Sequence, residues 1–134
     1  MVAVSSPYAA QKVVDPVADL AKRLDAEVLV VHVSRPSGGQ LREQEQATGE
    51  EAISLLRDKL QSRNVAVQDL LMFSDDIARA ILNTAVERDI TLIVLGLTGK
   101  NVFARLLAGN VPVELIKNTK IPVLILPPDW NRTV

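Results

Sequence analysis

The chain has no cysteine and a single histidine among its 134 residues. The absence of cysteine excludes disulfide bonds, thiolate zinc sites and cysteine nucleophiles together. A single histidine, His32, excludes an imidazole-rich metal site and any relay between two histidines. Because His32 stands in an apolar segment, we expect it to be a structural residue of a strand. The sequence therefore predicts neither a metal site nor catalytic residues.

Neither sign of charge is in excess, and long apolar runs are absent. The chain has 15 Lys plus Arg against 16 Asp plus Glu, a net charge of −1, and no basic cluster. This balance argues against nucleic-acid binding, which needs several cations facing phosphates, and against a charged membrane-surface patch. No apolar run approaches the roughly 20 residues of a membrane-spanning helix, and the N-terminus has no signal-like segment. We therefore expect a cytoplasmic location.

What the sequence does contain is ordinary globular composition, with 48% hydrophobic and 23% charged residues. A chain of this length buries a real hydrophobic core but is too short for two ordinary domains. We predict a single domain over residues 1–134.

The spacing of apolar residues switches repeatedly between that of strands and that of helices. Short apolar segments typical of strands lie at 2–4, 28–33, 65–73, 91–95 and 121–126. Helical spacing lies between them, at 10–24, 52–60, 77–86 and 111–118. Alternating strands and helices predict a parallel sheet with right-handed crossovers and helices on both faces. In such folds ligands bind beyond the carboxyl ends of the strands, where the strand order reverses.

Two helix starts carry local signals. Pro16 cannot donate to the carbonyl of Lys12, so we expect either a kink there or a helix that begins afresh with Asp15 as its cap. Ser74, Asp75 and Asp76 provide a capping side chain and acids for a first turn. Adjacent acids on a helix do not face each other, so capping explains this pair better than acid–base chemistry.

The segment GLTGKNVFARLLAGN, residues 96–110, holds three of the six glycines in the chain. Glycines at the end of a strand allow positive φ and let backbone amides approach a ligand. The last of them precedes a predicted helix, whose N-terminal amides favour an anion such as phosphate. The alternative is turn geometry alone. A Walker loop is excluded, since Val94 stands where its first glycine would be, and no GxGxxG occurs.

The spacing of the three glycines resembles a family signature. Two residues separate Gly96 from Gly99, nine separate Gly99 from Gly109, and a small polar residue follows. This spacing is similar to the G-2x-G-9x-G-[S/T] motif of the nucleotide-binding branch of the universal stress protein family. The segments EVLVVHV, TLIVLGLTGK and IPVLILP resemble its second, fourth and closing strands. The resemblance implies a three-layer α/β/α sandwich whose five-stranded parallel sheet has the order 3-2-1-4-5. This is the adenine nucleotide alpha hydrolase-like, Rossmann-like arrangement. A dimer is implied as well.

The resemblance also implies a binding site for ATP or AMP, with Mg²⁺ only if the nucleotide is ATP. The adenine would lie near the backbone of Val33 and the ribose or phosphates near Ser5, with Leu95 and Gly96 as the floor. The amides offered to the phosphates would be those of Gly99, Gly109, Asn110 and Val111. Lys100 and Arg105 are either added cations or solvated loop charges.

Two positions depart from the family pattern. Where the family commonly has an aspartate after the first strand, this chain has Ser5, which hydrogen-bonds but carries no charge. Where serine or threonine follows the third glycine, this chain has Asn110, which remains a good helix cap.

Two functions follow from this pattern. The first is a non-catalytic stress-response sensor that binds an adenine nucleotide and acts through dimer or partner contacts. The second is a cytoplasmic regulatory domain of a larger protein, such as a transporter or kinase, with altered or lost nucleotide binding. A slow ATPase is not supported, because we find no positioned base or metal carboxylate. The apolar closing strand, Ile121 to Leu126, should lie at a sheet edge, where we expect it to pair with its copy in a homodimer.

Overall fold

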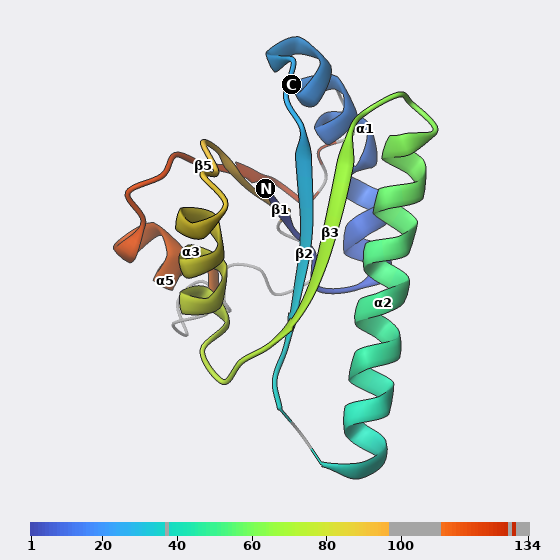
Figure 1. Cartoon of the computed structure of the whole chain (residues 1–134), viewed down its shortest axis with the longest axis vertical. Coiled ribbons are helices and arrows are strands. Elements are labelled where there is room, and N and C mark those ends of the chain that lie inside the picture. Colours follow the sequence, from blue (N-terminus) through green and yellow to red (C-terminus); the bar gives the residue numbers. More distant parts are fainter. Residues whose placement is uncertain (37, 97–110, 129, 131–134) are drawn as a thin grey trace.

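The computed structural model of the chain describes residues 1–36, 38–96, 111–128 and 130. Its centre is a parallel sheet of five strands in the order β3-β2-β1-β4-β5, which confirms the predicted order 3-2-1-4-5 (Figure 1). The strands are β1 (Val2–Ala3), β2 (Val28–Ser34), β3 (Val67–Phe73), β4 (Ile93–Gly96) and β5 (Val123–Leu126). The helices are α1 (Pro7–Leu24), α2 (Gly39–Gln61), α3 (Ile77–Glu87) and α5 (Val111–Asn118).

The helices cover both faces of the sheet, α1 and α2 on one side and α3 and α5 on the other (Figure 1). Each face has its own buried apolar cluster. All seven residues of β2 are buried, and its side chains alternate between the two clusters. Val30 belongs to the first cluster, whereas Val31 belongs to the second. A strand covered on both faces has no polar side to show, which is why this segment lacks the alternation of a half-exposed strand.

Helix α1 runs through Pro16 without interruption, so the expectation of a fresh start at Asp15 was wrong. The helix already has its N-cap at Ser6, whose hydroxyl accepts from the amide of Ala9 at 3.1 Å, followed by Pro7 at the first helical position. Pro16 is itself buried, and its neighbours Val13, Val14 and Val17 belong to the apolar cluster under the helix. Tertiary packing therefore holds the helix together across the missing hydrogen bond.

The cap of α3 is Asp76, whose Oδ1 accepts from the amide of Arg79 at 3.1 Å. Ser74 precedes this cap by two residues, and its hydroxyl accepts from the amide of Asp76 at 3.2 Å. The acids predicted for the first turn therefore precede the helix, and capping is confirmed as the role of this segment.

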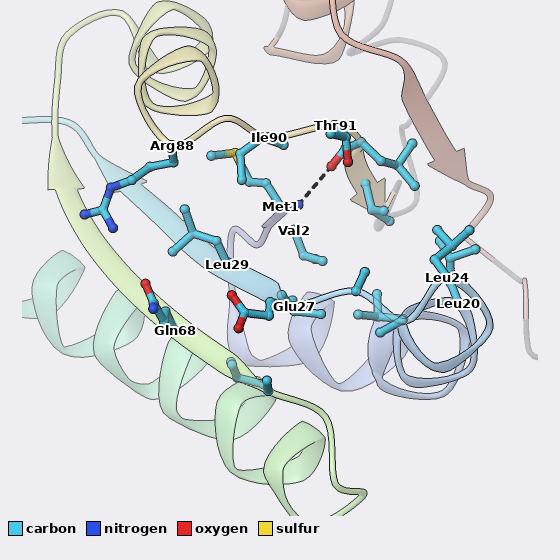
Figure 2. A pocket seen from close by; sticks show the side chains of 18 of the residues that line it. Met1, Val2, Leu20, Leu24, Glu27, Leu29, Gln68, Arg88, Ile90 and Thr91 are labelled. Carbon is cyan, nitrogen blue, oxygen red and sulfur yellow. Dashed lines mark hydrogen bonds between the residues drawn. The ribbon is translucent and has the colours of Figure 1, made fainter.

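At the amino edge of the sheet, β1 begins further into the sheet than the strands on either side of it. Val2 pairs with Val30, while β2 already begins at Val28. A cavity of about 730 Å³ lies here between α1, the strand starts and the connection before β4 (Figure 2). The Met1 amino group at this edge donates to the carbonyl of Leu92 at 2.9 Å. Burial lowers the pKa of this amino group from 8.0 to about 6.

This amino group makes the stability of the chain depend on pH. Folding lowers its pKa, so the unfolded chain binds more protons between pH 6 and pH 8, and the free energy of unfolding rises with pH in that window. The expected rise from pH 6 to pH 8 is about 2 kcal/mol. Urea unfolding at a series of pH values measures it, with the Nα-acetylated chain as the control. Parallel curves for the two proteins would contradict the prediction.

Within the described part of the chain, no helix has the length and apolar character needed to cross a bilayer.

Candidate functional site

A cavity of about 640 Å³ opens at the carboxyl edge of the sheet, where β1, β2 and β4 end. Strands β1 and β4 are neighbours although two other strands separate them in sequence, so the strand order reverses between them. The start of α1, the first half of α2, the first turns of α3 and the start of α5 complete its walls. The cavity therefore stands at the switch point where α/β folds of this kind bind their ligands.

The structure brings five of the predicted site residues to this one cavity. They come from three strand ends and one helix start: Ser5, Val33, Leu95, Gly96 and Val111 all line it. The other predicted residues, Gly99, Gly109 and Asn110, lie outside the described residues, as do Lys100 and Arg105. Ligand contact by any of these residues stays a prediction.

Most of the wall is apolar. Val13 of α1 and Ile81 of α3 face the cavity from opposite sides of the sheet, with Leu95 of β4 between them. All three side chains are buried by the surrounding protein. An apolar cleft with a few polar groups is the usual form of a small-molecule site, and it suits a flat aromatic ring.

Gly96 is required here for a reason that the sequence did not indicate. A Cβ atom on this residue would lie 2.7 Å from Cγ1 of Val13, closer than side chains approach each other. Among the described glycines, only Gly39 has a positive φ. Gly96 therefore serves the close approach of α1 to the end of β4. The left-handed backbone expected at this residue was wrong, whereas its contact with a ligand stays a prediction.

Polar groups are gathered on the β2 side. His32 Nδ1 lies 2.7 Å from the Val4 carbonyl oxygen, and Nε2 lies 3.0 Å from the hydroxyl of Ser34. Both side chains are buried and line the cavity. Both ring nitrogens of His32 have partners, in agreement with the structural role predicted for it.

Sequence reasoning missed two groups of lining residues. Arg35, the first residue after β2, brings an exposed cation to the cavity, and its position after a strand at the carboxyl edge was a usable signal. The polar side chains of Gln44, Glu45 and Thr48 come from α2. Nothing in the sequence marks those three, because a polar cavity wall and a solvated helix face have the same composition.

The described residues contain no group of three or more His, Cys, Asp or Glu side chains that could hold a metal ion. Glu45 is the single carboxylate in the part of the cavity wall that the structure describes. The described part of the wall thus combines the cation of Arg35, the carboxylate of Glu45 and several hydroxyl and amide groups around an apolar floor. That combination suits binding of a polar aromatic molecule more than acid–base chemistry between paired carboxylates.

The sequence model described as the universal stress protein family matches residues 1–127. A universal stress protein of Methanocaldococcus jannaschii is 30% identical over 118 residues, which span 81% of this chain and 69% of that protein.

Two solved structures share the fold at lower identity. The universal stress protein from Archaeoglobus fulgidus in complex with dAMP has a TM-score of 0.72 at 23% identity, covering 92% of this chain and 93% of that one. A universal stress protein family protein from Arabidopsis thaliana with AMP bound has a TM-score of 0.67 at 16% identity, covering 96% and 91%. These two likenesses show the architecture.

Proposed function

This chain belongs to the universal stress protein family, and on that premise we propose that it binds an adenine nucleotide in the cavity at the carboxyl edge of its sheet. The observation that carries the proposal is the meeting of Ser5, Val33, Leu95, Gly96 and Val111 around that single cavity. Solved relatives with dAMP or AMP bound support it.

We assign each part of a nucleotide to the region of the wall whose chemistry suits it. The apolar residues around Val33 and Ile81 suit the adenine ring. The hydroxyl of Ser5 suits the ribose, and the amides at the start of α5 suit a phosphate. Arg35 adds a positive charge for an anionic ligand. ATP and AMP are the proposed ligands, with Mg²⁺ only if ATP is bound.

A pair of aromatic substitutions tests the site. Ser5 is exposed and lines the cavity, so Ser5→Trp should place an indole in the cavity without disturbing the core. Gln11 is exposed on α1 and does not line the cavity, so Gln11→Trp adds the same group elsewhere. Isothermal titration of nucleotide-stripped protein with ATP and AMP should give saturable binding for the wild type and Gln11→Trp. Ser5→Trp should give none.

Two results would contradict the proposal. Absence of binding by the folded wild-type protein would show that the cavity does not take these nucleotides. Equal affinity in the wild type and Ser5→Trp would place the nucleotide elsewhere on the molecule.

We further propose that the bound nucleotide acts as a signal, in a non-catalytic stress-response role carried out through dimer or partner contacts. The alternative, a regulatory domain of a larger protein such as a transporter or kinase, draws support from the uncharged Ser5, where the family commonly has an aspartate. The titration separates the two functions, because a folded dimer that binds neither ATP nor AMP favours the alternative.

A further inference from the structure

His32 connects three segments of the chain beside the cavity. It lies in β2 at 8% exposure, one residue before Val33, and its side chain is on the same face of the sheet as Val30. This is the face that α1 and α2 cover. The ring therefore stands between the sheet and α2, at the wall of the cavity.

The hydrogen bonds of the ring fix its tautomer. A carbonyl oxygen only accepts, so Nδ1, at 2.7 Å from the Val4 oxygen, carries a proton and donates it. Nε2, at 3.0 Å from the Ser34 hydroxyl, is left with a partner that can donate or accept. The bond to Val4 is thus the one in which the donor and the acceptor are fixed. It joins β2 to the residue that follows β1.

Val4 is held by β2 at both of its backbone groups. Its amide donates to the carbonyl of Val31 at 3.0 Å, and its carbonyl accepts from His32. The peptide bond between Val4 and Ser5 is planar and trans. Fixing the Val4 carbonyl therefore fixes the opposite direction for the Ser5 amide. On the far side of Ser5 the chain is secured again where Ser6 caps α1.

Gly49 of α2 makes room for the ring. A Cβ atom on Gly49 would lie 2.4 Å from Cδ2 and 2.9 Å from Nε2 of His32. Apart from proline, glycine is the least favourable residue inside a helix, and this one is buried in the middle of α2. The close passage of α2 over the imidazole accounts for its presence.

We infer that His32, packed under Gly49, is a positioning residue of the nucleotide pocket that holds the Val4 carbonyl and so places Ser5 against the ligand. This inference rests on the proposed function, because Ser5 is the residue assigned to the ribose. His32 acts through Ser5 and is not assigned a ligand contact of its own.

Three variants separate positioning from stability. His32→Leu removes the donor to Val4. His32→Asn keeps a donor, because the amide nitrogen of asparagine takes the place of Nδ1. Gly49→Ala keeps His32 but pushes its ring away, and Glu51→Ala, an exposed change in the same helix, is its control. We measure AMP affinity by isothermal titration, melting temperature, and the amide resonance of Ser5 in the nucleotide-free protein.

The expected pattern divides the variants by the hydrogen bond and not by stability. The Kd for AMP should rise by about tenfold in His32→Leu and Gly49→Ala, and stay within about threefold of wild type in His32→Asn. The Ser5 resonance should move in the first two and stay close to wild type in the third. Melting temperature should fall in both His32 variants, because asparagine leaves part of the space of the ring unfilled and leucine leaves the Val4 carbonyl without its hydrogen-bond donor. Glu51→Ala should match wild type throughout.

Equal affinity in His32→Leu and wild type, with an unmoved Ser5 resonance, would overturn the inference. So would an asparagine variant as weak as the leucine variant, because affinity would then follow stability alone. If wild type binds no AMP, the proposed function fails, while the Ser5 resonance still decides whether His32 positions the turn.

Discussion

Replacing Leu56 by alanine should lower the free energy of unfolding by about 2–5 kcal/mol. Leu56 is fully buried on the inner face of α2, at 0% exposure, within the cluster between α1, α2 and the sheet. The shorter side chain loses its transfer free energy and leaves a hollow that helices fixed on a sheet fill only in part. Alanine is a better helix former than leucine, so helix propensity does not contribute to the loss.

The same helix offers a matched control. Leu41 is 64% exposed, so Leu41→Ala should change the free energy of unfolding by no more than about 0.5 kcal/mol. Urea denaturation of both variants and the wild type measures the difference. Similar losses at the two positions would mean that α2 does not cover the sheet along the face that carries Leu56.

The apolar pattern predicted the strands well but placed three of their starts two residues too early. Strands expected from positions 65, 91 and 121 begin at Val67, Ile93 and Val123. The skipped residues include apolar ones that finish the preceding turn. Val65 is buried but donates its amide to the carbonyl of Leu60 in α2, and the amide of Ile121 donates to the hydroxyl of Thr119. Apolar residues in a sequence predict burial, but they do not predict which carbonyl or hydroxyl a backbone amide will bond to.

Helix α2 shows where periodicity fails as a signal. The pattern indicated a helical face through residues 52–60, yet the helix already begins at Gly39. Its first turns extend past the end of β2 (Figure 1), and its first half is exposed at most positions. Where a helix leaves the sheet there is no core to face, so no apolar stripe forms and the sequence shows only polar residues.

The candidate site was predictable as far as topology determines it. Ser5, Val33 and Leu95 each lie close to the carboxyl end of a strand, and parallel strands bring these ends to one edge. The bond from His32 to Val4 was beyond reach, because it joins residues 28 positions apart across two strands. The resemblance to a family supplied the strand order, from which that neighbourhood follows.

The second large effect concerns self-association through β5. This strand has β4 on one side and forms the edge of the described sheet, as predicted for the closing strand. The amide of Ile93 donates to the carbonyl of Pro122. Because successive residues of a strand direct their backbone groups to opposite sides, the amide and carbonyl groups of Val123 and Ile125 point away from β4. An edge of apolar residues with outward amides is suited to pairing with a second copy, and we propose a homodimer built on it.

Ile125→Pro should convert that dimer to a monomer. Proline removes the outward amide of Ile125 but takes no hydrogen bond from the ladder with β4, and edge strands tolerate it. Ile125→Ala keeps the amide and shortens only the side chain, so it should remain dimeric. Sedimentation velocity at micromolar concentration distinguishes the two states. A monomeric wild type would refute the dimer itself, whereas a dimeric proline variant would show that the interface does not use the β5 backbone.

Because the cavity lies at the carboxyl ends of β1, β2 and β4 and not along the outer edge of β5, the affinity for AMP should be the same in the monomeric proline variant as in the wild type. Its loss would mean that the second copy completes the site.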